Sequence, residues 1–269
     1  MPQTIFITGS STGLGRATAL LFAQKGWHVI ATMRNPAKET ELGSIAGITL
    51  LELDVTKPAQ IDAAVRSALA KGPVDVVFNN AGYGLAGPFE GATDDQLVHE
   101  IDTNLLGVLR VTKAFIPSFR ERGSGTFIAT TSIGGLVTFP LNSVYHATKF
   151  GLEGWSESLA FELGKFGIRV KTVAPGGVKT DFISRSLVMT PHPAYAALAA
   201  KVMSVFMDPS RAANHSTAEQ IAEGVWEAAT DGKDQVTYVA GVDAKGMYAH
   251  RLAVGVEEFR KQIAQLFLG

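Results

Sequence analysis

The sequence predicts an α/β fold in which a parallel sheet is covered by helices on both faces. Short apolar segments alternate with helical segments of ten or more residues, and the apolar segments are continuous rather than alternating in polarity. The chain has 269 residues, 46% of them hydrophobic and 18% charged, which is enough material for a large core. No internal repeat, low-complexity tract or linker interrupts the alternation, so we expect residues 1–269 to form one domain.

The individual elements follow from apolar runs and helical periodicity. Seven runs are predicted to be strands: 4–8, 27–32, 48–53, 74–78, 125–131, 168–174 and 235–240. Helices are predicted at 16–25, 54–70, 93–120, around Tyr145 and at 217–230, with a weak helix before residue 48. In the helix that ends near Ala70, Thr56 is a candidate cap and Pro58 lies in the first turn.

Two segments depart from this rhythm. Residues 180–215 are expected to form an insertion with helical pieces that serves as a substrate lid. The tail at 242–269 carries an amphipathic helical stripe: Leu252, Val256, Phe259, Ile263 and Leu266. A helix of this kind packs on its own domain or forms a subunit contact, and the sequence leaves both open.

Composition excludes several classes of protein. The net charge is −1 and the basic residues are scattered, so nucleic acid is not an expected partner. The absence of cysteine excludes disulfides, thiolate metal sites and a cysteine nucleophile, and His99, His192 and His215 have no metal-binding spacing. The first residues do not resemble a secretory signal, and no apolar run reaches about 18 residues. We therefore expect a soluble, cytoplasmic protein with neither a metal nor a membrane partner.

A glycine-rich loop follows the first strand directly. Gly9, Gly13 and Gly15 form the pattern Gly-x3-Gly-x-Gly between that strand and the first helix. Glycine lets the backbone turn tightly and approach a pyrophosphate, whose charge then meets the helix N-terminus. The loop predicts a dinucleotide site, although such a turn can also form without a ligand.

The end of the second strand indicates which dinucleotide is bound. NAD sites place Asp or Glu there to hold the ribose 2′-hydroxyl. Here Met33 and Arg34 occupy the position, and the first carboxylate is Glu39. An arginine binds the 2′-phosphate of NADP through charge-assisted hydrogen bonds, each worth about 1.5–3 kcal/mol. We expect NADP(H) rather than NAD(H), unless Arg34 is only a solvated surface side chain.

Tyr145 and Lys149 share one face of their helix because they are four residues apart. The ammonium favours the phenolate, so we expect it to lower the tyrosine pKa from about 10. A pKa of about 7 needs roughly 4 kcal/mol, which one charge about 4 Å away supplies at an effective dielectric near 20. Tyr145 would then act as an acid and base near neutral pH. An aromatic–lysine pair at this spacing is also common on helix surfaces.

Several motifs occur together in one chain, in this order: Thr8-Gly9-x3-Gly13-x-Gly15, Asn79-Asn80-Ala81-Gly82, Asn104, Ser132, Tyr145-x3-Lys149 and Pro175-Gly176. With this set, the sequence resembles the short-chain dehydrogenase/reductase family over residues 3 to about 240. The resemblance implies a Rossmann-type doubly wound parallel sheet of about seven strands in three α/β/α layers. A nicotinamide coenzyme is expected across the carboxyl ends of the strands.

The resemblance also implies which residues bind NADP(H). They are Gly9, Ser11, Thr12, Gly13, Leu14 and Gly15 in the loop, Arg34, Asp54 and Val55 on the adenine side, Asn80, Ala81 and Gly82 at the adenosine ribose, Tyr145 and Lys149 at the nicotinamide ribose, and Pro175, Gly176, Val178 and Thr180 at the nicotinamide.

The implied reaction passes a hydride to a carbonyl carbon while Tyr145 gives a proton to the oxygen. Ser132 would share the developing negative charge, and Asn104 would hold a water that links Lys149 to solvent. Taken alone, Ser132 could be an ordinary loop serine and Asn104 a capping or surface residue. His146 adjoins Tyr145, but one residue along a helix rotates by about 100°, so we assign no histidine a catalytic role.

Substrate contacts are expected from the loops at about 83–92, 133–142 and 181–215. Their apolar members are Tyr83, Leu85, Leu136, Val137, Phe139, Leu141, Phe182, Leu187, Met189, Tyr195, Met203, Phe206 and Met207. Three of the six methionines lie here, which suits an adaptable lid. We expect a hydrophobic ketone, aldehyde or secondary alcohol, with Arg185 the one candidate for contact with an acidic group. The end of the second strand and the Tyr145 helix look like the branch of retinol and 17β-hydroxysteroid dehydrogenases, an appearance that bacterial carbonyl reductases share.

The leading interpretation is therefore an NADPH-dependent carbonyl reductase, reversible as an alcohol dehydrogenase. One alternative is a catalytically silent NADP-binding sensor or scaffold on the same fold, which would need none of the four catalytic residues. Another is an extended-type epimerase or dehydratase, for which the chain is too short. By the same resemblance we expect a homodimer or homotetramer, joined through the helix at 93–120 and the Tyr145 helix.

Overall fold

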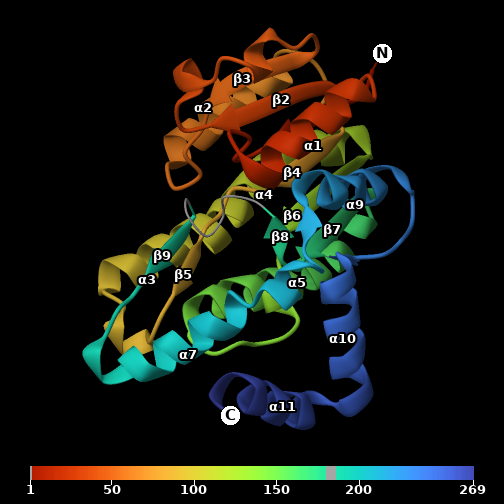
Figure 1. The fold of residues 1–269 in the computed structure, drawn as a ribbon. Coiled ribbons are helices and arrows are strands. Elements are labelled where there is room, and N and C mark those ends of the chain that lie inside the picture. Colours follow the sequence, from red (N-terminus) through yellow and green to blue (C-terminus); the bar gives the residue numbers. More distant parts are fainter. Residues whose placement is uncertain (1, 180–185) are drawn as a thin grey trace.

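A seven-stranded parallel sheet lies at the centre of the computed structural model, which describes residues 2–179 and 186–269 (Figure 1). The strand order is β11-β7-β6-β4-β1-β2-β3. These strands are β1 Thr4–Ile7, β2 His28–Met33, β3 Ile48–Glu52, β4 Val76–Asn79, β6 Gly125–Thr130, β7 Ile168–Pro175 and β11 Thr237–Ala240. Two small sheets pair β5 (Gly84–Ala86) with β9 (Leu187–Met189) and β8 (Val178–Lys179) with β10 (Ser216–Thr217). The predicted Rossmann-type α/β fold is confirmed.

Helices cover both faces of the sheet (Figure 1). They are α1 Gly13–Gln24, α2 Pro58–Leu69, α3 Asp94–Ile101, α4 Gly107–Arg122, α5 Ser143–Gly164, α7 Ala196–Phe206, α8 Pro209–Ala212, α9 Ala218–Thr230, α10 Val242–Val254 and α11 Val256–Leu268. Successive residues of a strand point to opposite faces. Ile5 and Ile7 therefore pack with Phe22 of α1 and with α9, whereas Phe6 packs with Phe115 of α4 and with α2 and α5. None of the described helices is long and apolar enough to cross a bilayer.

The long helix predicted at 93–120 contains a wide turn. Thr93 caps α3 through a capping box with Gln96. Between α3 and α4 the backbone forms a π-helical turn, Asp102–Leu106, that carries Asn104. Asn104 is 1% exposed, so this turn brings a polar side chain into the interior. π-helical turns inside α-helices occur frequently at functional sites.

Two local predictions are wrong. The weak helix expected before residue 48 is replaced by short 3₁₀ turns at Pro36–Lys38 and Leu42–Ser44. Lys57, not Thr56, is the N-cap residue of α2, and the Thr56 hydroxyl instead donates to Asp54 Oδ1 at 2.7 Å. Asp54 thereby closes a local turn that competes with helical backbone hydrogen bonds, which a periodicity argument does not reveal.

The C-terminal tail forms two helices separated at Gly255, whose φ of 83° favours glycine. The predicted stripe is broken at this point, and three of its members are exposed: Leu252, Val256 and Leu266. Phe259 remains buried, and α11 packs against α7, where the rings of Phe206 and Phe267 lie 5.0 Å apart. The tail therefore covers the chain's own insertion helix.

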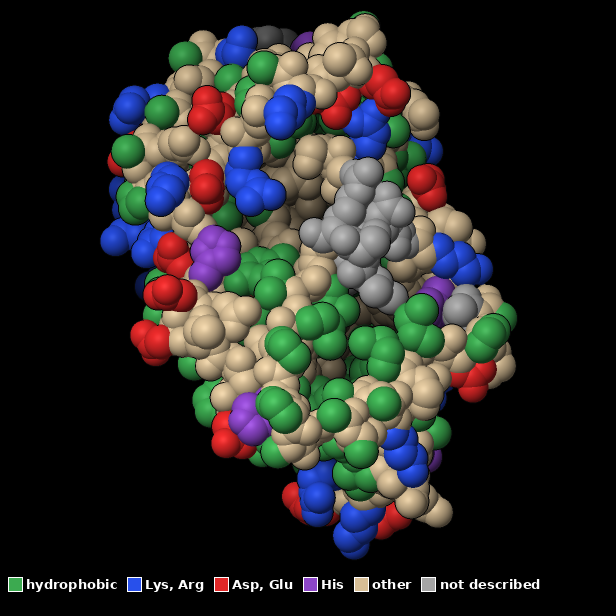
Figure 2. Space-filling view, turned by 60° about the vertical axis from the view of Figure 1, so that its left-hand side comes forward, with side chains coloured by type: hydrophobic (Ala, Val, Ile, Leu, Met, Phe, Trp, Pro, Cys, Tyr) green, Lys and Arg blue, Asp and Glu red, His purple; other side chains and the backbone are tan. Residues whose placement is uncertain are grey.

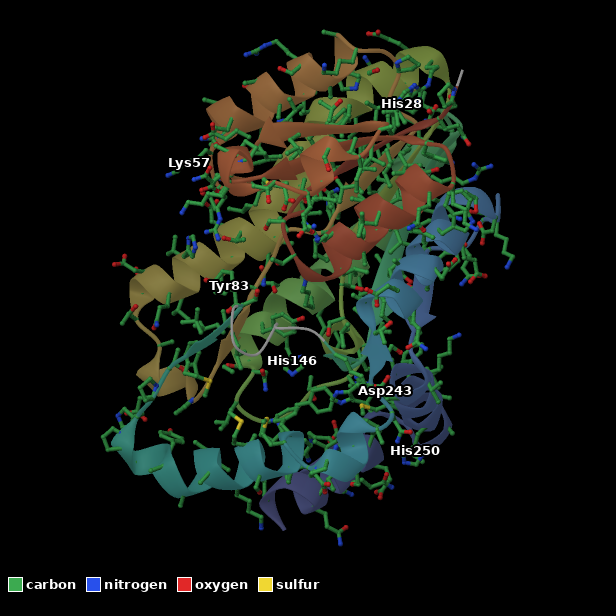
Figure 3. The ribbon with its side chains drawn as sticks, turned by 45° about the horizontal axis from the view of Figure 1, so that its top comes forward. His28, Lys57, Tyr83, His146, Asp243 and His250 are labelled. Atoms are coloured by element: carbon green, nitrogen blue, oxygen red, sulfur yellow. The ribbon has the colours of Figure 1, made fainter. Side chains whose placement is uncertain are left out.

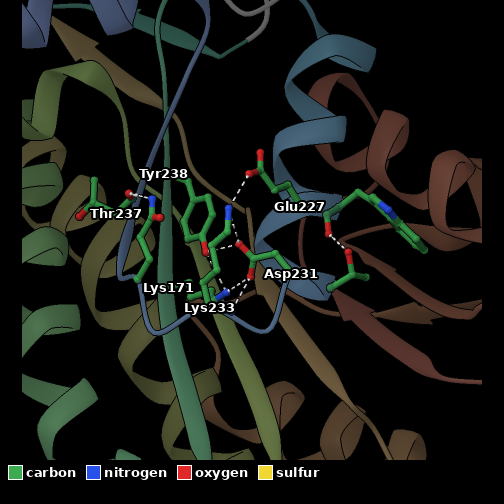
Figure 4. A network of polar contacts seen from close by, with 9 residues as sticks. Lys171, Glu227, Asp231, Lys233, Thr237 and Tyr238 are labelled. Carbon is green, nitrogen blue, oxygen red and sulfur yellow. Dashed lines mark hydrogen bonds and ion pairs between the residues drawn. The ribbon is translucent and has the colours of Figure 1, made fainter.

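A buried ion pair ties β11 to β7 and to the turn after α9 (Figure 4). Lys171 is 1% exposed, and its Nζ donates to Asp231 Oδ1 at 2.7 Å and to Tyr238 Oη at 2.9 Å. The Tyr238 hydroxyl donates to Asp231 Oδ2 at 2.6 Å. Burial alone would raise the pKa of Asp231, but the hydrogen bonds from Lys171 and Tyr238 lower it to about 2. The groove between α9 and β11 beside this network contains none of the predicted site residues.

Replacing Asp231 with Asn should destabilise the protein by about 3 kcal/mol, because the Lys171 ammonium stays buried without a counter-charge. The folded-state pKa of Asp231 lies below its ordinary value of 3.8, so the stabilisation is present above about pH 4 and is lost as the pH falls toward 2. Urea unfolding across this pH range measures both effects. Lys233→Ala is the control: its 58%-exposed ammonium also lies near Asp231 but should contribute less than about 1 kcal/mol. Equal losses in the two variants would contradict this account.

Candidate active site

The glycine loop lies at the carboxyl end of β1, where the strand order reverses between β4 and β2. Gly9 has a φ of 68°, and a Cβ there would lie 2.9 Å from Ala81 Cα. A Cβ on Gly15 would lie 2.3 Å from the Gly9 carbonyl oxygen. Gly13, with a φ of 54°, begins α1. The three glycines therefore form a cradle at a helix N-terminus where the backbone can approach a pyrophosphate closely.

The other loop residues surround this cradle. Ser11 and Thr12 are exposed, and Leu14, in the first turn of α1, packs against the core. Thr12 is the N-cap residue of α1, yet its side chain makes no capping bond to any described residue. The first-turn N–H groups consequently lack a side-chain partner at the cap, and they attract an anion.

Asn80 ties the loop to two neighbouring strands. Its Nδ2 donates to the carbonyls of Thr8 and Gly9 at 3.2 and 3.1 Å. Its Oδ1 accepts from Thr130 Oγ1 at 3.2 Å. The backbone N–H groups of Asn80 and Ala81 donate to Thr8 Oγ1 at 2.9 and 3.0 Å. These two predicted cofactor residues hold the loop in shape as well as lying beside it.

Arg34 is exposed just beyond β2. The carboxylate of Glu39 is already engaged in hydrogen bonds with other residues. Glu39 Oε1 accepts from the N–H groups of Glu41 and Leu42 at 2.9 Å each. Its Oε2 accepts from Arg16 Nη1 at 2.8 Å. Arg16 is therefore neutralised by an ion pair, and Glu39 is not free to hold a ribose hydroxyl.

Asp54 and Val55 follow β3 at the same edge of the sheet. Burial would raise the pKa of Asp54, but two hydrogen bonds from Thr56 and the nearby charge of Arg34 lower it. Val55 is 7% exposed and packs against the start of α4, where a Cβ on Gly107 would lie 2.8 Å from its Cγ2. Asp54 and Arg34 thus lie close enough for their charges to interact.

Three of the predicted catalytic residues meet at the carboxyl end of β6. Lys149 Nζ donates to the carbonyl of Thr130 at 2.8 Å and lies 5.6 Å from the centre of the Tyr145 ring. Ser132 follows β6 and lies close enough to the Tyr145 hydroxyl to lower its pKa by hydrogen bonding. Lys149 is 6% exposed, so its amine lies in the interior beside the phenol.

Asn104 reaches the same place from the π-helical turn. Its Oδ1 accepts from the Tyr83 N–H at 2.9 Å, and its Nδ2 donates to the Tyr83 carbonyl at 2.7 Å. A Cβ on Gly82 would lie 3.0 Å from Asn104 Oδ1 and 3.8 Å from Lys149 Nζ. Gly82 therefore leaves space that the Asn104 amide and the Lys149 amine both face.

The expected lowering of the Tyr145 pKa is wrong for this structure. Burial raises the pKa of Tyr145 to about 12; the Ser132 hydrogen bond lowers it, and the charge of Glu100 raises it. Burial also lowers the pKa of Lys149 to about 8, against the charges of Glu100 and Glu153. Removal from water opposes both the phenolate and the ammonium, and it has the largest effect on each pKa.

The segment after β7 forms the remaining side of the site. Pro175 ends β7, and a Cβ on Gly176 would lie 2.4 Å from the Asp243 carboxylate oxygens. Val178 belongs to the short strand β8. Thr180, predicted to bind the nicotinamide end, lies outside the described residues.

The expected substrate side is apolar but unevenly exposed. Figure 2 shows a hollow on this face with hydrophobic side chains gathered below it. Leu85 and Val137 are buried in the protein, whereas Met189 and Met207 are 45% and 57% exposed. Phe182 and Arg185 lie outside the described residues.

Phe139 connects this side to the C-terminal tail. Its ring lies 5.8 Å from that of Phe206 on α7 and 6.1 Å from that of Phe267 on α11. The loop after β6, the insertion helix α7 and the last helix α11 therefore share one aromatic cluster, and the tail packs behind Phe139.

Residues 3–188 match the family model described as short chain dehydrogenase. The chain belongs to the short-chain dehydrogenase family. It is 38% identical over 182 residues to 3-ketodihydrosphingosine reductase from Bacteroides thetaiotaomicron. This match covers 67% of the present chain and 66% of the reductase. It is also 39% identical over 197 residues to human retinol dehydrogenase 8, and this match covers 69% of the present chain and 62% of the retinol dehydrogenase. The chain thus spans slightly less than two thirds of the length of these curated relatives.

The fold similarity extends over almost the whole chain. A short-chain dehydrogenase from Streptomyces avermitilis matches it with a TM-score of 0.86 and 32% identity, covering 98% of this chain and 95% of that one. The short-chain dehydrogenase family comprises oxidoreductases that act on alcohol or carbonyl groups with a nicotinamide coenzyme.

His146 is a residue of this short-chain dehydrogenase that sequence reasoning set aside. Its Nδ1–H donates to the carbonyl of Gly134 at 2.6 Å, and its Nε2 accepts from the Phe139 N–H at 2.9 Å. The Gly134 N–H donates in turn to Ser132 Oγ at 3.0 Å. His146 lies near the centre of the molecule in Figure 3 and is 6% exposed. Burial lowers the pKa of His146, which favours the neutral ring that these bonds require.

As the 100° rotation per residue predicts, the His146 ring does not point with Tyr145. The ring reaches the preceding loop and fixes the segment between Ser132 and Phe139. A signal was present in the sequence: His146 is three residues before Lys149 and six before Leu152, on the inner face of α5, where all three are buried.

Replacing His146 with Ala should loosen residues 133–142, because two buried backbone groups lose their partner at about 1–3 kcal/mol each. In the wild type, the folded-state pKa of His146 lies below 6.5. The stabilisation is therefore present above about pH 6.5 and is lost as the pH falls through the folded-state value. Hydrogen–deuterium exchange of this loop, at neutral and acidic pH, measures both effects. His28→Ala, at an exposed position of β2, is the control. If residues 133–142 exchange no faster in His146→Ala than in His28→Ala, the role of His146 is refuted.

Proposed function

We propose that the protein is an NADP(H)-dependent carbonyl reductase, reversible as an alcohol dehydrogenase. The observation that carries the proposal is the convergence of Ser132, Tyr145 and Lys149 beside the glycine cradle at a helix N-terminus. A protein that only bound the dinucleotide would need the cradle but neither the half-buried Tyr145 nor the buried Lys149.

The chain's own residues perform the proton transfer. Bound NADPH supplies a hydride to the carbonyl carbon. Tyr145 donates its hydroxyl proton to the carbonyl oxygen as the C=O π electrons move onto that oxygen, and Ser132 stabilises the developing charge by hydrogen bonding. Lys149 balances the phenolate that remains. Because burial raises the pKa of Tyr145 to about 12, the phenol is held protonated, which is the form that carbonyl reduction needs.

The preference for NADP(H) rests on the charges beyond β2. Glu39 is engaged by two backbone N–H groups and by Arg16, so it does not repel a phosphate or compete for the ribose. Arg34 is exposed at the end of the strand and forms no ion pair with any described residue. A free guanidinium in that place suits a 2′-phosphate.

The substrate is proposed to be a hydrophobic ketone or aldehyde of moderate size. Phe139, Phe206 and the exposed Met189 and Met207 surround the expected substrate side with apolar and adaptable side chains. Association into a homodimer or homotetramer is also proposed, and the 85% exposure of Phe161 on α5 supports a contact through that helix.

Changing Tyr145 to Phe should lower turnover with NADPH by about 10²- to 10⁴-fold, because the ring is kept while the proton donor is lost. NADPH binding should remain nearly intact. Turnover is measured with a panel of apolar ketones and aldehydes, by the change in coenzyme absorbance. NADPH binding is measured by fluorescence titration. Turnover that is unchanged would rule out Tyr145 as the acid.

Changing Arg34 to Asp should weaken NADPH binding far more than NADH binding, because a like charge replaces the partner of the 2′-phosphate. The loss of one charge-assisted hydrogen bond predicts at least about 10-fold for NADPH. Dissociation constants for both coenzymes measure the difference. Arg66→Asp, on the exposed face of α2, is the matched control. An equal loss for NADPH and NADH would refute the assignment.

A further inference from the structure

Glu100 is a buried carboxyl group beside the active site that the mechanism above does not use. It is 0% exposed and is the one buried residue of α3. Its Oε1 accepts from the Leu85 N–H at 3.1 Å and from Asn104 Nδ2 at 3.3 Å. Its Oε2 is buried and has no hydrogen-bond partner among the described residues. An unsatisfied buried carboxylate oxygen is costly, so it calls for an explanation.

The groups around Glu100 are those of the catalytic site. The charge of Glu100 acts on Lys149 and Tyr145 of α5 and on Tyr83 in the segment before β5. The neighbouring acid on the same helical segment, Asp102, pairs with Arg110 instead. No described Lys, Arg or His comes within ion-pair distance of Glu100, so burial raises the pKa of its carboxyl group to about 7. Both its acid and its carboxylate forms are accessible near neutral pH.

Asn104 connects Glu100 to the lysine. The Asn104 amide donates to Glu100 with its nitrogen, while its oxygen faces the space at Gly82 that Lys149 Nζ also faces. The carboxyl group is therefore one side chain away from the amine that supports the phenol. Its charge acts on that amine and on the phenol, because a Glu100 carboxylate raises the pKa of both Lys149 and Tyr145.

We propose that Glu100 is the proton store of this active site, a positioning and proton-relay residue that restores the Tyr145 hydroxyl after each turnover. The inference rests on the proposed reductase function. In carbonyl reduction, the proton of Tyr145 passes to the substrate oxygen and leaves a phenolate. The phenolate takes a proton from the Lys149 ammonium, and the Glu100 carboxylic acid then resupplies Lys149 across the space at Gly82 that the Asn104 amide and Lys149 Nζ both face. Glu100 remains as a carboxylate until it takes a proton from solvent. Alcohol oxidation runs these transfers in reverse.

A purely structural role for Glu100 would not need an acid. The Leu85 N–H and the Asn104 amide require an acceptor, which the side-chain oxygen of glutamine supplies equally well. Glutamine would also avoid the cost of burying an ionisable group. The acid is therefore the informative feature, and the isosteric change to glutamine separates the two roles.

The test is Glu100→Gln in the full chain, with Glu121→Gln on the exposed surface of α4 as the control. We expect the wild type to show an ionisation near neutral pH in its pH–kcat profile that the Glu100 variant lacks. Its kcat for ketone reduction should fall about tenfold while the KM for NADPH and the melting temperature stay unchanged. Infrared spectroscopy of the resting protein should show a carboxylic acid band that titrates near neutrality in the wild type and in Glu121→Gln but not in Glu100→Gln.

The infrared measurement needs no turnover, so it separates this proposal from the function on which it rests. Absence of a titrating band in the wild type would overturn the proton store. A titrating band together with identical pH–kcat profiles in the wild type and Glu100→Gln would overturn it as well. If the wild type reduces no carbonyl compound although the band is present, the reductase proposal fails, and the relay fails with it.

Discussion

Asn80 directly follows β4, and its side chain joins the carboxyl end of that strand to those of β1 and β6. The site depends on this junction. The side chain donates to the carbonyls of Thr8 and Gly9 after β1, and it accepts from the Thr130 hydroxyl at the end of β6. Lys149 donates to the Thr130 carbonyl, so the amine of the catalytic pair is attached to the strand end that holds the glycine loop. The cradle for the coenzyme and the proton donor are therefore positioned by one continuous set of hydrogen bonds. Displacing Asn80 would move both.

Burial decides the electrostatics of this site more than the pairwise attraction between Tyr145 and Lys149. An ammonium next to a phenol lowers the phenol's pKa only while the ammonium remains charged, and removal from water weakens that charge. Here burial acts on both groups, and the Glu100 carboxyl adds a third ionisable partner. The protonation state of the site is thus a property of the three groups together.

Residues that do not touch the substrate set the geometry of those that do. His146 fixes the loop that carries Ser132 and Phe139, and Asn104 fixes the backbone of Tyr83 next to Gly82. The last helix of the chain extends this support, because Phe267 packs against Phe206 and Phe139. The catalytic groups and the apolar wall therefore belong to one packed unit, assembled from segments far apart in the sequence.

The sequence alone determined the sheet, the order of its strands and helices, and the motif residues at the carboxyl edge. These are local: apolar runs define buried strands, glycine at positions 9, 13 and 15 defines a loop, and a four-residue spacing brings Tyr145 and Lys149 onto one face. Tertiary structure decided what periodicity cannot encode. It broke the C-terminal stripe at Gly255, replaced the Thr56 cap with an Asp54 turn, directed His146 to the preceding loop and enclosed Glu100 beside Lys149. The placement of His146 and of Glu100 depends on which distant segment packs against each residue and on how much water that packing removes.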